Sequence, residues 1–148
     1  MSAFPDDRRD LAAIFVPLAR ALVAREEPAL RAHGVSMWGY VVLTALAEQP
    51  VRTQAALAQA INADKSRIIG VLDDLQQRGL IRRQPDASDR RMHLLSLTPE
   101  GDRLLRSVQA VIRASEEEVL GSLPPADREV FLRSLRALYE CWGPREKL

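Results

Sequence analysis

The sequence has little of what metal sites, disulfide frameworks and catalytic centres require. Its 148 residues include one cysteine, Cys141, and two histidines, His33 and His93, which are far apart in the chain. One cysteine cannot form an intramolecular disulfide, and no Cys-x-x-Cys or His-Glu-x-x-His spacing is present. Phosphate-binding glycine loops and nucleophile elbows are also missing. We therefore expect no metal, no cofactor and no catalytic residues.

Long hydrophobic runs are also scarce. The first ten residues contain no apolar signal core, and the longest apolar stretch, residues 11–19, is too short to span a bilayer. Hydrophobic residues still make up 47% of the chain, which is enough for a packed core. These features favour one soluble, cytoplasmic domain over residues 1–148, with no membrane partner.

The net charge of +1 is unevenly distributed along the chain. Residues 51–98 contain eight Lys or Arg and five Asp or Glu, a local net charge of +3. The flanking residues contain 13 basic and 15 acidic side chains, a net charge of −2. Positive charge concentrated in one segment favours a phosphate-bearing partner there.

The most informative segment runs from Thr53 to Gly101. Thr53 and Asp64 are each suited to cap a short helix, and residues 62–63 form the turn between the two helices. Gly79 is suited to end the second helix in a left-handed conformation. The expected inward-facing residues are Ala56, Leu57 and Ile61 in the first helix, and Ile68, Val71, Leu72 and Leu75 in the second.

Two strand-like runs follow, at 80–83 and 92–97, around the polar loop 84–91. Two short helices followed by such a hairpin are the order of a helix-turn-helix with a β-hairpin wing. Residues 51–98 are therefore predicted to form a winged helix-turn-helix unit that contacts DNA.

Helical patterns flank this unit on both sides. A first helix is expected to start near Leu11. Pro17 should kink or shorten this helix, and Pro28 should split it. Ser36 caps a second helix, and Thr98-Pro99-Glu100 begins a long one that a break at 121–125 separates from the last helix. Their apolar stripes are Leu11, Ile14, Phe15, Leu18 and Leu22; Trp38, Val42 and Leu46; Leu104, Val108, Val111, Ile112 and Val119; and Phe131, Leu135, Leu138 and Trp142.

A chain of this length cannot bury all these stripes around one small core. Burial against a second copy is the economical solution, so residues 5–34 and 99–144 are predicted to form a dimerisation frame. The expected fold is mainly α with a small β-hairpin wing, a winged helix-turn-helix embedded in this frame. Cys141, in the last helix, is interpreted as a structural thiol.

The second short helix begins with Lys65, Ser66 and Arg67. Positive charge opposes the dipole at this end of a helix, and an anionic partner would offset that effect. Such side chains can reach phosphates and base edges in the major groove, and Gly70 would allow close approach. We expect these four residues to contact DNA, together with Thr53 and Gln54.

The hairpin loop carries Arg90 and Arg91 at its end. Adjacent arginines suit insertion into the minor groove, where the negative potential attracts them. Asp89 could orient one of them through a bidentate pair, so all three residues are expected at the DNA interface.

These motifs together resemble those of the MarR (multiple antibiotic resistance regulator) family. The matching features are Leu57-Ala58, a helix that ends in Leu-x-x-x-Gly-Leu at 75–80, the D-x-x-D-R-R wing at 86–91, and Leu-Thr-x-x-Gly at 97–101. The resemblance implies a homodimeric transcription factor that binds a pseudo-palindromic DNA operator, most relatives being repressors. It also implies dimerisation through the first and the last two helices.

Family members commonly lose DNA affinity when a small aromatic or amphipathic molecule enters a cleft beside the frame. His33, Trp38 and Tyr40 lie near the expected hinge between the first two helices and are the candidate effector-binding residues. The structural alternative is that Trp38 belongs to the core and His33 only ends a helix.

A rival from another functional class is a winged helix used for protein–protein assembly. There, Arg82, Arg83, Arg90 and Arg91 would meet an acidic partner instead of DNA. A sequence-specific complex with DNA would exclude this rival. An enzyme is a third and weaker alternative, because no acid-base or nucleophile constellation is present.

Overall fold

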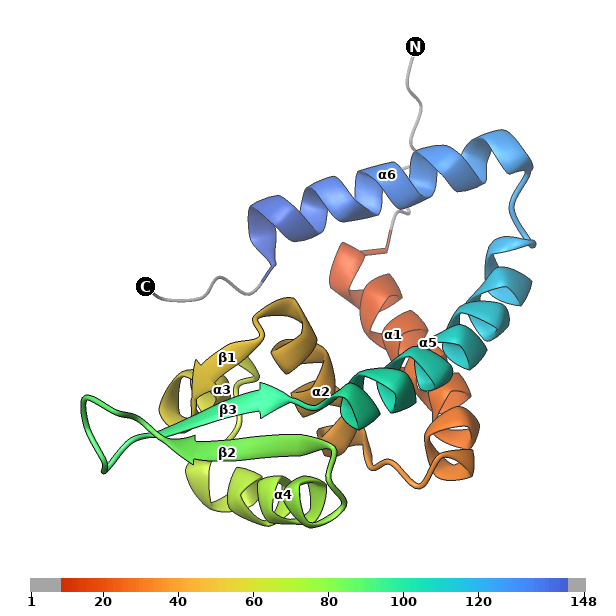
Figure 1. Ribbon diagram of the computed structural model, residues 1–148. Helices are drawn as coiled ribbons and strands as arrows, with labels where there is room; N and C mark the ends of the chain where they lie inside the picture. The colour runs from red at the N-terminus through yellow and green to blue at the C-terminus, as the bar shows by residue number, and fades with distance from the viewer. Residues whose placement is uncertain (1–8, 144–148) are drawn as a thin grey trace.

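The computed structural model describes residues 9–143, which form six helices and three short strands (Figure 1). In chain order these are α1 (Leu11–Ala32), α2 (Met37–Glu48), β1 (Val51–Thr53), α3 (Gln54–Ala60), α4 (Lys65–Gln77), β2 (Ile81–Pro85), β3 (His93–Leu97), α5 (Pro99–Leu120) and α6 (Pro125–Trp142). The fold is mainly α with a small antiparallel sheet, and the winged helix-turn-helix lies between helices from both ends of the chain. This confirms the predicted fold class.

Side-chain caps start four of the helices at the predicted residues. The cap oxygens of Ser36, Thr53, Asp64 and Thr98 accept hydrogen bonds from backbone N–H groups over 2.9–3.3 Å. At the other end of α4, Gly79 has a φ of 72°, the left-handed conformation that glycine adopts readily. Local polar chemistry therefore sets these boundaries.

The sheet has the strand order β1-β3-β2. Strands β2 and β3 pair antiparallel from Ile81 opposite Leu97 to Pro85 opposite His93, two residues beyond the predicted end of the first wing strand. Strand β1 was not predicted: it has three residues and pairs with the free edge of β3. So short a run has no alternation of its own, and only its pairing with β3 makes it a strand.

Helix α1 is one continuous helix, so the predicted division near Pro28 is wrong. Both Pro17 and Pro28 lie inside it. Each proline removes a single backbone N–H from the hydrogen bonds of the helix, and the bonds on either side can hold the helix together.

The core is formed by the end of α1, by α2, α3, α4 and the sheet, and by α5 as far as Ile112. Leu43, Leu46, Leu57, Ile68, Leu72, Leu75, Leu95, Leu105, Val42 and Val108 are the largest fully buried side chains. Ala56 was predicted to face inward but is exposed, while its neighbours Leu57 and Ala58 are buried. In α5, Val108 and Ile112 of the predicted stripe are buried together with Leu105, whereas Val111 of the same stripe is exposed in the single chain.

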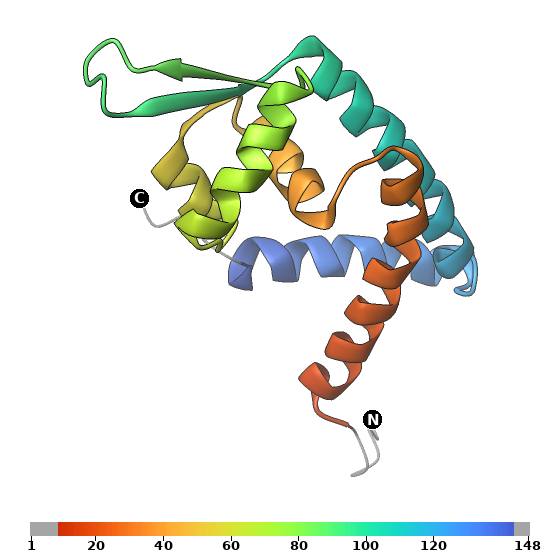
Figure 2. The same ribbon diagram turned by 90° about the horizontal axis from the view of Figure 1, so that it is seen from below.

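The helical frame contrasts with this core. Helices α1 and α5 lie against each other, while α6 crosses beside them and away from α4 and the wing (Figures 1 and 2). No residue of α6 is buried in the single chain. An apolar groove of about 380 Å³ separates α6 from α1 and α5, lined by Phe15, Leu18, Leu22, Leu120, Phe131 and Leu135 among others.

Candidate nucleic-acid interface

The N-terminus of α4 presents two cationic side chains next to the capping carboxylate of Asp64. Lys65, Ser66 and Arg67 are all exposed, and no acid lies in the first turn. Within residues 9–143 neither Lys65 nor Arg67 forms an ion pair. Their charges oppose the helix dipole, so an anion docked here would gain from both side chains and from the positive end of the dipole.

The start of α3 lies beside the start of α4 and the base of the wing. Thr53, Gln54, Lys65, Arg91 and His93 line one depression of about 220 Å³, with Ala55 and Met92. Four of these residues were predicted DNA contacts from three separate stretches of sequence. The structure therefore brings Thr53, Gln54, Lys65 and Arg91 together on one surface, and adds His93, which the sequence pattern had not marked.

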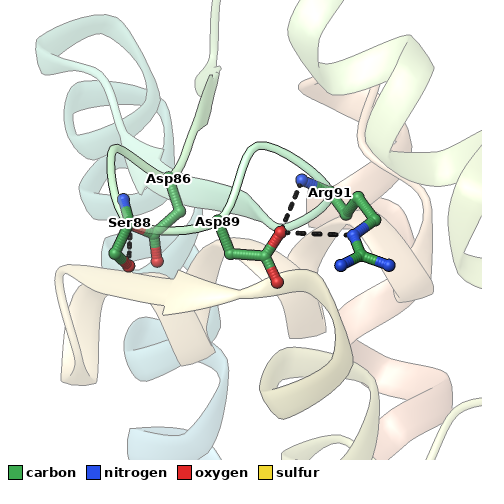
Figure 3. A network of polar contacts seen from close by, with 4 residues as sticks. All are labelled: Asp86, Ser88, Asp89 and Arg91. Carbon is green, nitrogen blue, oxygen red and sulfur yellow. Dashed lines mark hydrogen bonds and ion pairs between the residues drawn. The ribbon is translucent and has the colours of Figure 1, made fainter.

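The wing loop is ordered by two aspartates (Figure 3). Asp86 accepts hydrogen bonds from the backbone N–H and the hydroxyl of Ser88, at 2.9 and 2.8 Å. These bonds lower the pKa of Asp86 below its ordinary value, so the loop-closing carboxylate keeps its charge to a lower pH than an ordinary aspartate.

Asp89 holds the second turn of this loop through a single oxygen. Its Oδ1 accepts the backbone N–H of Arg91 at 3.0 Å and lies 3.6 Å from Arg91 Nε (Figure 3). The predicted bidentate pair is therefore not formed, because the oxygen that faces Arg91 also closes the turn. The Arg91 side chain remains 94% exposed, and Arg90 is exposed too.

Arg83 has a different role from the arginines at the tip of the wing. Its Nη2 lies 3.0 Å from Asp73 Oδ1, which joins β2 to α4, and its side chain is only 20% exposed. The sequence pattern had grouped Arg83 with the other wing arginines. Only the packing of β2 against α4 reveals that it fixes the wing relative to α4.

Gly70 lies on the exposed side of α4. A Cβ added there would meet nothing within 4 Å in the single chain, so no internal packing requires a glycine at this position. Its position is consistent with the predicted close approach to a partner, which remains a prediction.

The three candidate effector residues lie in different surroundings. His33 ends α1, where its Nδ1 lies 2.7 Å from the carbonyl oxygen of Ala29. Trp38 is half-buried at the start of α2. Tyr40 alone of the three lines a cavity of about 270 Å³, which it shares with Val41, Thr44, Ala45, Glu48, Arg52, Ala60, Ile61 and Tyr139.

Three helices meet around Tyr40. Burial, reinforced by the charge of Glu26 on α1, raises the pKa of the Tyr40 hydroxyl. Burial and the nearby charge of Glu116 on α5 raise the pKa of Glu26 in turn. The cavity therefore lies beside a junction where α1, α2 and α5 place partly desolvated polar groups.

Other kinds of site were also sought. Over residues 9–143, no group of three or more His, Cys, Asp or Glu side chains is arranged to hold a metal ion. In the same range no helix combines the length and apolar character needed to cross a membrane. Cys141 is exposed on α6 in the single chain, whereas a structural role had been predicted for it.

Comparisons with known proteins agree with this architecture. The family model described as "MarR family" matches residues 35–93, from the end of α1 to the wing. A Thauera aromatica protein named as a regulatory protein for the hcr operon is 31% identical over 132 residues, covering 89% of this chain and 75% of that protein. The transcriptional regulator HosA of Escherichia coli is 33% identical over 99 residues, 67% of this chain and 73% of HosA. This chain belongs to the MarR family.

Solved MarR-type structures extend the similarity to the frame. The PcaV regulator of Streptomyces coelicolor, solved in complex with its natural ligand, superimposes with a TM-score of 0.64 at 29% identity, covering 90% of this chain and 96% of PcaV. The chain is thus a transcriptional regulator of MarR type, a class of DNA-binding proteins, and its named relatives are regulators and not enzymes.

Proposed function

We propose that this MarR-type regulator is a homodimeric repressor that binds a pseudo-palindromic operator. The observation that carries the proposal is the shared surface of Thr53, Gln54, Lys65 and Arg91, with Ser66, Arg67 and Gly70 on the adjoining helix. Helix α4 would lie in the major groove, and the wing, with Asp89, Arg90 and Arg91, in the minor groove. The regulator would act in the cytoplasm, with residues 51–98 as the DNA-binding unit.

The exposed apolar frame supports the homodimer. The α6 side chains Phe131, Leu135 and Leu138 are 37%, 38% and 51% exposed in the single chain. A second copy that inserts its terminal helices into the groove between α6 and helices α1 and α5 would bury them, with residues 5–34 and 99–144 as the dimerisation segments of the sequence. Two-fold symmetry of the protein would then match two half-sites about one helical turn of DNA apart.

Release of the operator by a small aromatic or amphipathic ligand is the regulatory part of the proposal. The cavity beside Tyr40 lies between α2, α3 and α6, where an occupant could change how the frame holds the winged helix. PcaV has been solved with a natural ligand, which supports a ligand in a related chain. Of the predicted effector residues, Tyr40 is the one whose position supports such a contact.

The decisive experiment is fluorescence anisotropy with DNA fragments that tile the upstream region of the chain's own gene, with competitor DNA and a salt series. We expect a tight, salt-sensitive complex of one dimer on one fragment. Weak binding that is equal on all fragments, with no site recovered by genome-wide selection, would instead favour a protein-assembly role. In that role Arg83 would contribute little to an acidic partner, because Asp73 already engages it.

The effector is tested with the same operator fragment. A panel of small aromatic acids, phenols and amphipathic compounds would be screened for thermal stabilisation of the protein and for release of the fragment. A compound that does both, and whose effect is weakened in Tyr40→Phe, would support the cavity. Stabilising compounds that never alter operator affinity would contradict ligand release.

A further inference from the structure

Trp38 and Arg67 form a contact between the first turn of α2 and the first turn of α4, the helix proposed to enter the major groove. The guanidinium carbon of Arg67 lies over the indole ring of Trp38, 5.7 Å from the ring centroid. Trp38 is the second residue of α2 and is half-buried, whereas Arg67 is the third residue of α4 and is exposed. This distance is within the range of a cation–π interaction.

The backbone around Trp38 is built to lie close to α4. Ser36 caps α2 by accepting the N–H of Gly39 at 2.9 Å, which fixes the first turn that carries Trp38. A Cβ at buried Gly39 would lie 3.7 Å from Leu75 of α4, so the two helices approach closely here. Beside Leu75, at the C-terminal end of α4, Arg78 donates to the carbonyl oxygen of Gly34 at 2.8 Å, a second link between this region and α4.

The contact with Trp38 leaves the N–H donors of Arg67 available to a ligand. A cation–π interaction acts through the charge of the guanidinium and does not use its five N–H donors. Unlike Arg83 and Arg91, Arg67 has no acidic partner within residues 9–143. An arginine held over an aromatic ring has also given up part of its rotamer freedom before it meets a ligand, so less entropy is lost on binding.

We infer that Trp38 is a positioning residue for DNA recognition, which holds the Arg67 guanidinium over its ring so that the N–H donors are available to a phosphate or a guanine. This inference rests on the proposed function. It gives Trp38 a role in reading DNA, in place of the effector-binding role that its sequence position had suggested. It also makes the first turn of α2 part of the DNA-reading apparatus.

The test is a double-mutant cycle on operator affinity. Trp38→Leu removes the ring but keeps an apolar side chain, and Arg67→Ala removes the cation. We expect Trp38→Leu to weaken operator binding about two- to fivefold in the parent, the range of an exposed cation–π contact. In the Arg67→Ala background the same change should have almost no effect, because the side chain it positions is gone.

Two further variants separate positioning from a structural role. Trp38→Phe keeps a smaller aromatic face and should recover part of the loss, whereas Arg67→Lys keeps the charge and should not restore parental affinity. With single-base operator variants, Trp38→Leu and Arg67→Ala should lose discrimination at the same positions. Melting temperatures of all variants, measured without DNA, show whether any loss of affinity comes from unfolding.

The outcomes are distinguishable. Equal losses for Trp38→Leu with and without Arg67 would overturn the inference, as would parental affinity in Trp38→Leu, while leaving the repressor proposal intact. If Arg67→Ala binds like the parent but Lys65→Ala does not, the operator surface stands and the role of Trp38 falls. A parent protein that prefers no DNA sequence would overturn both proposals.

Discussion

The winged helix and the helical frame differ in how far their apolar side chains are buried within one chain. In the winged helix, Leu57 and Leu72 are completely buried within one chain. In the frame, Leu138 and Trp142 are 51% and 87% exposed, although both belong to one predicted apolar stripe. The winged helix thus buries its apolar side chains within one chain, together with those of α2 and α5, whereas the frame leaves the apolar side chains of α6 exposed.

The largest expected effect comes from placing a charge in the frame. Phe131→Asp puts a carboxylate in the groove between α1, α5 and α6, where a second copy would have to bury it. We expect loss of the dimer and, because two half-sites are no longer bound together, a fall in operator affinity of at least about 100-fold. Leu135→Asp should behave in the same way. Analytical ultracentrifugation and anisotropy measure the two effects.

The matched control for this change is Ser134→Asp, which adds the same charge to α6 at a residue that does not line the groove. It should remain dimeric and bind the operator like the parent. If Phe131→Asp is also dimeric, the frame does not associate through this face, and the contrast with the winged helix needs another explanation.

Alanine substitutions at two glycines test the comparison through the free energy of unfolding. A Cβ at Gly101, where the winged helix joins α5, would overlap the carbonyl oxygen of Leu80 and lie 2.8 Å from Leu97 Cδ1. Gly101→Ala should therefore lower the free energy of unfolding by about 3 kcal/mol, since backbone must move. Gly70→Ala meets no atom and should raise it by about 0.5–1 kcal/mol.

Urea unfolding measures both changes, and Gly70→Ala has a second readout. If α4 approaches DNA closely at this residue, the added methyl group should weaken operator binding although the protein is more stable. A Gly70→Ala protein that binds as tightly as the parent would show that this part of α4 does not touch DNA.

Substitutions on the DNA surface should affect binding without affecting the dimer. Lys65→Ala or Arg91→Ala should weaken the operator complex about tenfold. Each should also make log affinity less steeply dependent on log salt concentration, by about 0.9 in slope for each phosphate that the protein no longer neutralises. Arg106→Ala removes an exposed arginine that pairs with Asp102 at 2.8 Å on α5, and serves as the control. Unchanged salt dependence in Arg91→Ala would remove the wing from the interface.

The same two regions show how far the sequence alone could be interpreted. Caps such as Thr53, Asp64 and Thr98 act within three residues, so helix starts in the winged helix were predicted correctly. Strand β1 and the Arg83–Asp73 pair depend on contacts between elements, which no local pattern encodes. For the same reason the sequence could predict the individual residues of the candidate surface, but not the depression in which Thr53, Gln54, Lys65 and Arg91 come together.

The smallest expected effect lies at the junction of the two regions, where Glu26 of α1 is close to Tyr40 of α2. Because burial and Glu116 raise the pKa of Glu26 in the folded protein, the folded state holds this proton more tightly than the unfolded chain. Stability should therefore fall as the pH rises from the ordinary glutamate value of 4.5 through the raised pKa, and stay lower above it. Glu26→Gln should be more stable than the parent at neutral pH and lose less stability across that window. Urea unfolding at several pH values measures the difference, with the substitution Glu27→Gln at an exposed residue as the control. If the free energy of unfolding of Glu26→Gln and of the parent changed in parallel with pH, protonation of Glu26 would not affect stability.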